Sequence, residues 1–334
     1  MNTNNKFEWF ASGNAPVLFP TELVIGRFVF DDLTAINIPE STPFAADWGE
    51  AVSMHLLPEK YHPAPKHIML SWLSITESKF YAVIEELPEE QIAALLSEKD
   101  EKTKKPKYNT LIAGMAPYGK VAIWLSGNGI TTEVAWLQGE AITFDMQRFA
   151  PGSTLTQEAY SKAALAESEE ACKNFQKNGL PDPALFERYM QKFNYRITPK
   201  FGKKAEFSAI ELSYYNGEAD ATNSGEHATN AMRAKPRKIA LHWHVKKREF
   251  SAYFWTDEKK IIDIFDQFYK ENAQQNGELL IEVDESNQEF KFTLQDKFIA
   301  IEIPTEAMEM IIFKNKIEFF RSKNYSKSTG EWRK

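Results

Sequence analysis

Cysteine is almost absent from this chain of 334 residues, and its scarcity excludes several structural devices. The only cysteine is Cys172, so no disulfide can form within the chain and no cysteine cluster can hold a metal. Cys172 lies in a charged stretch that we expect to be helical, and we interpret it as an incidental thiol. The apolar fraction of 43% is ordinary for a globular protein, so a packed core can form.

Long hydrophobic runs are also missing. No stretch approaches the length that a membrane-spanning helix requires, which predicts that there is no integral membrane segment. The first residues, 1–6, contain neither an apolar signal region nor a cysteine for lipid attachment. The sequence as given therefore predicts a cytoplasmic protein, or a periplasmic one if an N-terminal leader has been removed.

The charge balance and the absence of known catalytic motifs restrict the functions that the protein can have. Forty basic and 47 acidic residues leave a net charge of −7, which argues against nucleic acid as the partner. There is no Gly-x-Ser-x-Gly elbow, no phosphate-binding loop and no His-Glu-x-x-His helix. We therefore expect no cofactor and no catalytic residues, and we predict that the protein is not an enzyme.

Aromatic residues are abundant, with 24 Phe, 12 Tyr and 8 Trp, and this composition favours β-sheets. The clearest pattern lies in residues 65–96. Apolar residues alternate over 67–72 and again over 79–84, which is the period of a β-strand. Pro88 then begins an amphipathic helix. This stretch predicts a strand, a second strand and a helix.

The same pattern returns later in the chain. Residues 236–243 match residues 65–72 in spacing, with Trp243 in the place of Trp72. After a turn that we take to be one residue shorter, Phe250 falls in the place of Phe80. Internal repeats define architecture, so we predict two pseudo-repeated halves that each contain a β-β-α unit. The alternative is two unrelated units that share a preference for strands.

These patterns predict an α+β fold of mainly antiparallel sheets with a few helices. We expect a helix over 156–177 that ends at Asn178-Gly179, and a second helix over 184–193. The predicted segments are an N-terminal β-rich half (1–150), a helical connector (151–194), a C-terminal β-rich half (195–321) and a polar tail (322–334).

The pair His242 and His244 is the most metal-like feature of the sequence. Strand alternation places both imidazoles on one face, a spacing that transition-metal sites use. A third ligand would have to come from His227 or a distant carboxylate, and the site would then serve a metal-dependent hydrolase. The alternative, which we favour, is that both histidines are ordinary polar residues on a half-exposed face.

Three residues of a proline-rich loop are candidates for binding a partner: Trp48, Tyr61 and His62. Trp48 lies beside a glycine and either anchors a partner or staples the loop to a sheet. The exposed aromatics Trp48 and Tyr61 would also suit a module that binds glycans or the cell envelope. His62 has no nucleophile spaced to work with it, which favours a simple surface position.

An ordered series of short motifs indicates a relationship to a known family. The motifs are Phe7-Glu-Trp-Phe10, Gly26-Arg-Phe-Val-Phe30, Ile36-Asn-Ile-Pro39, Leu70-Ser-Trp-Leu-Ser74, Gly114-Met-Ala-Pro117, Trp124-Leu-Ser-Gly127 and Tyr215-Asn-Gly-Glu218. Together they resemble the bacterial domain-of-unknown-function 2931 family, most specifically over the first 140 residues.

This resemblance implies a role rather than a reaction. The family has no established enzymatic activity, and its members are often lipoproteins encoded beside type VI secretion genes, including genes for lipase-type toxins. The implied function is an immunity protein that binds its cognate toxin and neutralises it by occlusion. The sequence as given lacks the lipid-anchor leader of many members, so the resemblance does not determine which compartment the protein would protect.

Overall fold

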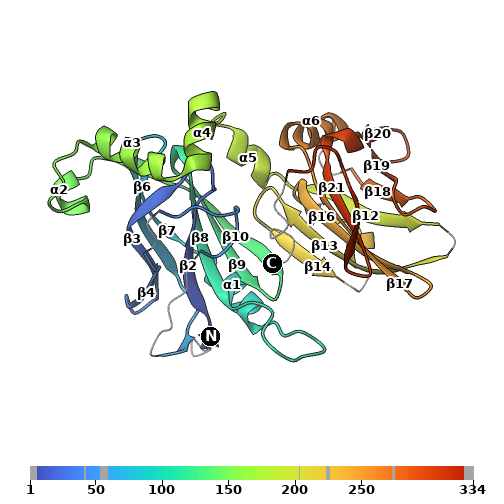
Figure 1. Cartoon of the computed structure of the whole chain (residues 1–334). Helices are drawn as coiled ribbons and strands as arrows, with labels where there is room; N and C mark the ends of the chain where they lie inside the picture. Colours follow the sequence, from blue (N-terminus) through green and yellow to red (C-terminus); the bar gives the residue numbers. More distant parts are fainter. Residues whose placement is uncertain are drawn as a thin grey trace. The chain divides into compact units, whose positions relative to one another are not determined.

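The chain folds into two β-rich units, Met1–Phe186 and Glu187–Lys334, in a computed structural model (Figure 1). The structure describes residues 6–40, 43–52, 59–202, 204–222, 226–272 and 275–326. Its sheets are mostly antiparallel or mixed, and six α-helices accompany them in the described part of the chain. The predicted β-rich character is therefore confirmed. Residues 327–334 of the predicted polar tail lie outside the described residues.

Two sheets face each other in the first unit, and β1 (Phe7–Glu8) and β5 (Tyr61–His62) form a separate two-stranded sheet. One sheet has the order β2 (Phe10–Asn14), β8 (Thr110–Ala116), β9 (Lys120–Gly127), β10 (Ile130–Gln138). The other has the order β11 (Glu140–Ile142), β7 (Lys79–Glu86), β6 (His67–Ser74), β3 (Thr21–Val29), β4 (Ala35–Asn37).

The core of this unit follows from strand alternation. Ile68, Leu70 and Trp72 of β6 point inward and are almost fully buried. They belong to one apolar cluster with residues of the facing sheet such as Leu111 and Ile123. Helix α1 (Glu89–Ser97) adds its buried side chains to the same cluster. Each of these large side chains contributes about 1.5–3 kcal/mol by leaving water.

The helical region departs from the sequence prediction in two places. The helix expected over 156–177 is two helices, α3 (Gln157–Glu167) and α4 (Glu169–Asn178), because Ser168 takes an extended backbone conformation. Leu165 and Ala171, one from each helix, pack together against Ile75. Gly179 ends α4 at a φ of 69°, as the Asn-Gly pair predicts. A single turn, α2 (Met146–Phe149), precedes them.

The helix expected over 184–193 is also shorter, since α5 covers only Leu185–Met190. Phe193 instead begins a strand, where it pairs with Arg233 and is buried. A buried aromatic residue with a cross-strand partner gains more from the sheet than from extending a short helix. The division between the two units falls within α5.

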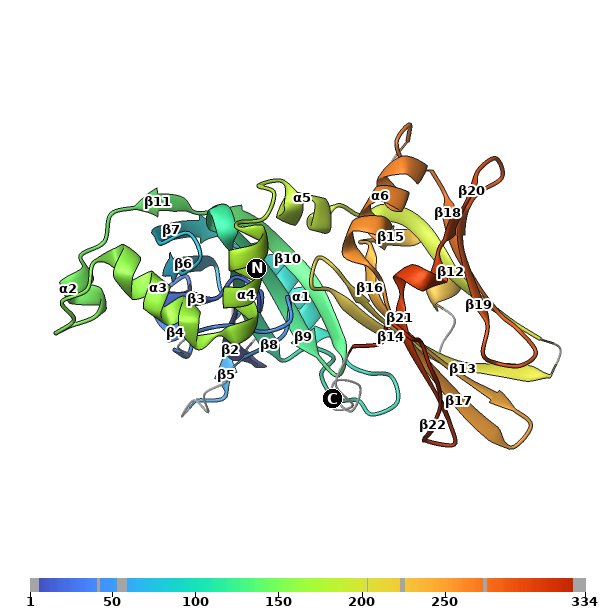
Figure 2. The same ribbon diagram turned by 45° about the horizontal axis from the view of Figure 1, so that its top comes forward.

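The second unit also contains two sheets. Its larger sheet has the order β14 (Ala219–Thr222), β13 (Ala205–Tyr214), β16 (Pro236–Val245), β17 (Arg248–Trp255), β21 (Glu309–Lys314), β22 (Ile317–Arg321). Its smaller sheet has the order β15 (Ala231–Arg233), β12 (Phe193–Phe201), β18 (Gly277–Val283), β19 (Phe290–Gln295), β20 (Ala300–Ile303). Helix α6 (Glu258–Phe268) packs against β19 and β20 (Figure 2).

Both predicted strand–strand–helix units are present, as β6-β7-α1 and β16-β17-α6, but their residue correspondence was wrong. The first hairpin turns through the four residues between Ser74 and Lys79, and the second through the two between Val245 and Arg248. The turn is therefore two residues shorter, not one. In the first hairpin Trp72 lies opposite Tyr81, and in the second Trp243 lies opposite Phe250. Phe250 therefore corresponds to Tyr81 and not to Phe80. A slip of one residue moves a side chain to the other face of the sheet.

Candidate partner-binding surface

The two histidines of the suggested metal pair share one face of β16 but have separate partners. The His242 Nδ1 atom lies 2.9 Å from the Ser251 hydroxyl, and its Nε2 atom lies 3.5 Å from a carboxylate oxygen of Glu211. This contact with His242 lowers the pKa of Glu211. The His244 Nδ1 atom lies 2.7 Å from the Ser208 hydroxyl.

The suggested third ligand, His227, lies on the opposite face of that sheet. Its ring centroid is 4.8 Å from the ring of Phe207, and Phe207 pairs directly with Trp243. Directly paired residues project from the same face, which is the face opposite His242. Within the described ranges, no group of three or more His, Cys, Asp or Glu side chains is arranged to hold a metal ion.

Trp48 staples its loop to the first unit. Its side chain is only 8% exposed and packs edge-to-face on Trp124, with ring centroids 4.7 Å apart, and against Phe186 at 5.6 Å. Gly114 makes this packing possible, because a Cβ atom there would lie 2.4 Å from Trp124 and 2.8 Å from Trp48. A buried ring offers little surface to a protein or glycan, so this geometry matches the staple interpretation.

Tyr61 and His62 form the short strand β5, which pairs with β1. Tyr61 is exposed, whereas the His62 ring stacks on Phe30 with centroids 6.1 Å apart. The His62 Nε2 atom lies 2.8 Å from the carbonyl oxygen of Glu59. Of the three residues suggested for partner binding, Tyr61 therefore presents the most free surface.

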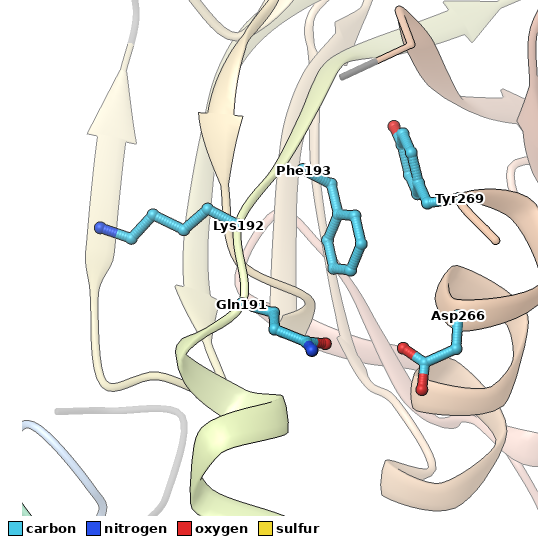
Figure 3. Close-up of a pocket in the computed structure, with 5 residues that line it drawn as sticks. All are labelled: Gln191, Lys192, Phe193, Asp266 and Tyr269. Carbon is cyan, nitrogen blue, oxygen red and sulfur yellow. The ribbon is translucent and has the colours of Figure 1, made fainter. Parts of the chain in front are cut away.

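A small hollow of about 310 Å³ lies in the second unit (Figure 3). Next to it is Lys235, whose side chain is fully buried. Its Nζ atom donates to the carbonyl oxygen of Arg188 at 2.9 Å and to the amide oxygen of Gln191 at 3.1 Å, and lies 3.3 Å from Asp266. The residues that line the hollow are Gln191, Lys192, Phe193, Asp266 and Tyr269.

These contacts explain the polar groups around the hollow as a structural network. Arg188 also donates to Asp266, at 2.8 Å, so this carboxylate neutralises two cations. Burial lowers the pKa of Lys235, and the neighbouring Asp266 opposes that shift. The network joins α5, the residue that follows it, the residue that precedes β16, and helix α6. No motif in the sequence indicates it, because its members are spread over residues 188–266.

An apolar surface that is partly open lies on the outer face of the sheet β11-β7-β6-β3-β4 in the first unit. One end of this face is covered by α3, where the Tyr160 hydroxyl donates to Glu22 at 2.8 Å. Leu73 and Phe80 are fully buried at that end.

The other end of this sheet face is open. In the strand register Met69 lies between Arg27 and Ile84, and Ile25 lies one row further along the strands. Ile84 is 66% exposed, Ile25 and Arg27 are exposed, and Met69 is half-buried. We refer to Ile25, Arg27, Met69 and Ile84 together as the open face. It combines apolar side chains with one guanidinium on a paired, rigid sheet.

The open face could not be predicted from the strand pattern of the sequence. The alternation over 79–84 places Ile84 on the same side as Phe80 and Ala82, but it does not indicate whether that side is covered. Phe80 is buried beneath neighbouring aromatic rings, with the Phe149 ring centroid at 5.1 Å, whereas Ile84 is 66% exposed. The acidic run Glu85-Glu86 directly after Ile84 is the signal that could have indicated an exposed strand end.

Comparisons with known proteins identify the first unit. A family model described as "Protein of unknown function (DUF2931)" matches residues 1–182, which include every residue of the open face. No curated protein and no solved structure matches the chain. Among the described residues, no helix is both long enough and apolar enough to cross a membrane.

Proposed function

This chain belongs to the DUF2931 family of proteins of unknown function, and from this premise we propose that it is a non-enzymatic immunity protein. It would bind a cognate antibacterial toxin delivered by type VI secretion and neutralise it by occlusion. A lipase-type toxin is the first candidate, because the resemblance to this family implies such a genetic setting.

The observation that carries this proposal is the open face. An exposed apolar patch rimmed by polar residues commonly marks a site of protein–protein contact. Arg27 adds a residue type that is enriched among the side chains that dominate binding energies. Because the sheet is paired and packed on its inner side, its backbone needs little ordering when a partner binds. A stable complex would bury roughly 1,600 Å² in total, with the open face near its centre.

Co-expression with the toxin encoded by the adjacent reading frame tests the proposal. We expect the wild-type chain to restore growth and to co-purify with the toxin. The substitution Ile84→Asp places a charge in the apolar patch, and we expect it to raise the Kd by about 100-fold, since a central contact contributes roughly 2–4 kcal/mol. Isothermal titration calorimetry measures this change.

Leu155→Asp is the matched control, because Leu155 is also exposed in the first unit but precedes α3 at the covered end of the sheet. It should bind the toxin as the wild type does, and both variants should keep the wild-type melting temperature. The proposal fails if the wild-type chain neither co-purifies with the toxin nor restores growth.

We also infer that the two strand–strand–helix units are related as a pseudo-repeat. Trp72 and Trp243 are both fully buried, and each stacks on the ring directly opposite it in the hairpin. The ring centroids are 5.6 Å apart for Trp72 and Tyr81, and 5.5 Å apart for Trp243 and Phe250. This shared environment supports a duplication.

A further inference from the structure

The turn between β19 and β20 in the second unit presents an exposed aromatic side chain. Phe298 is 90% exposed, more than any other large apolar residue for which an exposure is determined, and its neighbour Ile299 is also exposed. Leaving a phenylalanine in water forgoes about 1.5–3 kcal/mol of stabilisation. The Phe298 side chain therefore contributes little to the packing of the second unit.

The backbone of this turn is held in place. One carboxylate oxygen of Asp296 accepts hydrogen bonds from the backbone N–H groups of Phe298 at 2.7 Å and Ile299 at 2.8 Å. The Asp296 N–H donates to the carbonyl oxygen of Ile299 at 2.9 Å. These bonds fix the direction in which the Phe298 side chain leaves the turn. A turn whose backbone is ordered before binding loses less conformational entropy when a partner binds.

The apolar surface is confined to the tip of the turn. On the inner side of the hairpin, Leu294 and Ile303 are buried in the unit. Its outer side is polar, and Lys291 and Glu302 form a salt bridge there at 3.3 Å. A single aromatic ring surrounded by polar groups fits a concave apolar pocket with a polar rim, rather than a broad apolar surface.

We propose that Phe298 is an anchor that enters an apolar pocket on the toxin. The inference rests on the proposed function and adds a contact from the second unit, outside the 182 residues that the family model matches. Phenylalanine buries a large area with few rotatable bonds, and a small number of central anchors carries most of the affinity of an interface.

The experiment compares Phe298→Ala and Ile317→Ala in calorimetric titrations with the purified toxin. Ile317 is the matched control, because it is 73% exposed at the tip of the β21–β22 hairpin in the same unit. We expect Phe298→Ala to raise the Kd by 30-fold or more and Ile317→Ala to leave it within twofold. Phe298→Trp should retain most of the affinity, and all melting temperatures should match the wild type.

A second variant tests the role of the turn. Asp296→Ala removes the acceptor of both N–H groups but leaves Phe298 in place, and we expect it to weaken binding by roughly fivefold through the added flexibility of the turn. A wild-type affinity in this variant would show that the turn does not need to be fixed.

The outcomes separate the anchor from the function. If the wild type binds the toxin and Phe298→Ala binds equally well, the anchor is refuted while the immunity function stands. If the wild type does not bind the toxin, both are refuted. If Phe298→Ala loses binding to phosphatidylglycerol vesicles but keeps its affinity for the toxin, the exposed ring serves a lipid surface and the proposed protein contact is overturned.

Discussion

Glu22 is a carboxyl group that the first unit buries at the covered end of its sheet. Burial raises its pKa above the ordinary value of 4.5, and the hydrogen bond from Tyr160 opposes this shift. Burial, together with the same contact, raises the pKa of Tyr160 to about 12. Tyr160 therefore holds α3 on the sheet and also stabilises the charge of Glu22.

Tyr160→Phe should destabilise the protein by about 1–3 kcal/mol at pH 7, because the ionised Glu22 loses a hydrogen-bond donor in a buried position. Because folding raises the pKa of Glu22, the folded state binds more protons than the unfolded state in this pH range. The stability of the wild type therefore falls as the pH rises from 4.5 through the raised pKa. This fall should be steeper in the variant. Urea denaturation between pH 4 and pH 8 measures both curves.

The control for this prediction is Tyr61→Phe, which changes an exposed tyrosine in the same unit. Equal stability losses for Tyr160→Phe at pH 4 and pH 7 would show that the hydroxyl does not stabilise the charge of Glu22.

At the scale of elements, the Lys235 network joins the end of α5, the start of β16 and helix α6 through groups that are distant in sequence. Lys235→Met should destabilise the second unit by about 1–3 kcal/mol, because Asp266 and the carbonyl oxygen of Arg188 both lose the ammonium group that they contact. Thermal unfolding followed by circular dichroism measures this loss. Lys259→Met, at an exposed position of α6, should change the stability by less than about 0.5 kcal/mol.

If the Lys235→Met variant is as stable as the wild type, apolar packing can replace the network, as it can replace some buried ion pairs. The network would then determine which side chains meet at this junction without stabilising it.

Hairpins and helices differ in how well the sequence predicts them. The strands of both β-β-α units follow from alternation, and the end of α4 follows from Asn178-Gly179. The strand register could not be predicted from this alternation, because the number of residues in the turn determines on which side of the sheet Phe80 or Phe250 lies. The break at Ser168 has a local signal, because a serine followed by Glu169 and Glu170 is typical of a helix start, but the apolar pattern on either side predicts one continuous helix.

At the scale of the whole molecule, both units bury tyrosine hydroxyls. Burial raises the pKa of Tyr81 and Tyr160 in the first unit and of Tyr195, Tyr214 and Tyr269 in the second. In the unfolded chain these phenols lose their protons near pH 10. Above that pH the folded state binds more protons than the unfolded state. The free energy of unfolding is therefore unaffected by these phenols below pH 10 and decreases above it.

We therefore expect the free energy of unfolding to fall steadily from pH 10 to pH 12. Absorbance at 295 nm should show the exposed tyrosines ionising first, and the buried ones should ionise together with the loss of the circular dichroism signal. Full ionisation of all 12 tyrosines while the fold persists would contradict the burial of these hydroxyls.

The sequence by itself determined the class of the protein. Its aromatic, alternating segments require sheets, and its short motifs indicate the family that the comparisons then identified over residues 1–182. These properties are local, since strand period and motif identity can be read without knowing which segments meet.

Only the tertiary structure decided which apolar residues stay in contact with solvent. It buried Trp48, left Ile84 and Phe298 exposed, and separated His227 from His242 by the thickness of a sheet. The physical reason is that exposure depends on what packs over a face. That cover comes from segments far away in the chain, as α3 shows by covering one end of its sheet and leaving the other open.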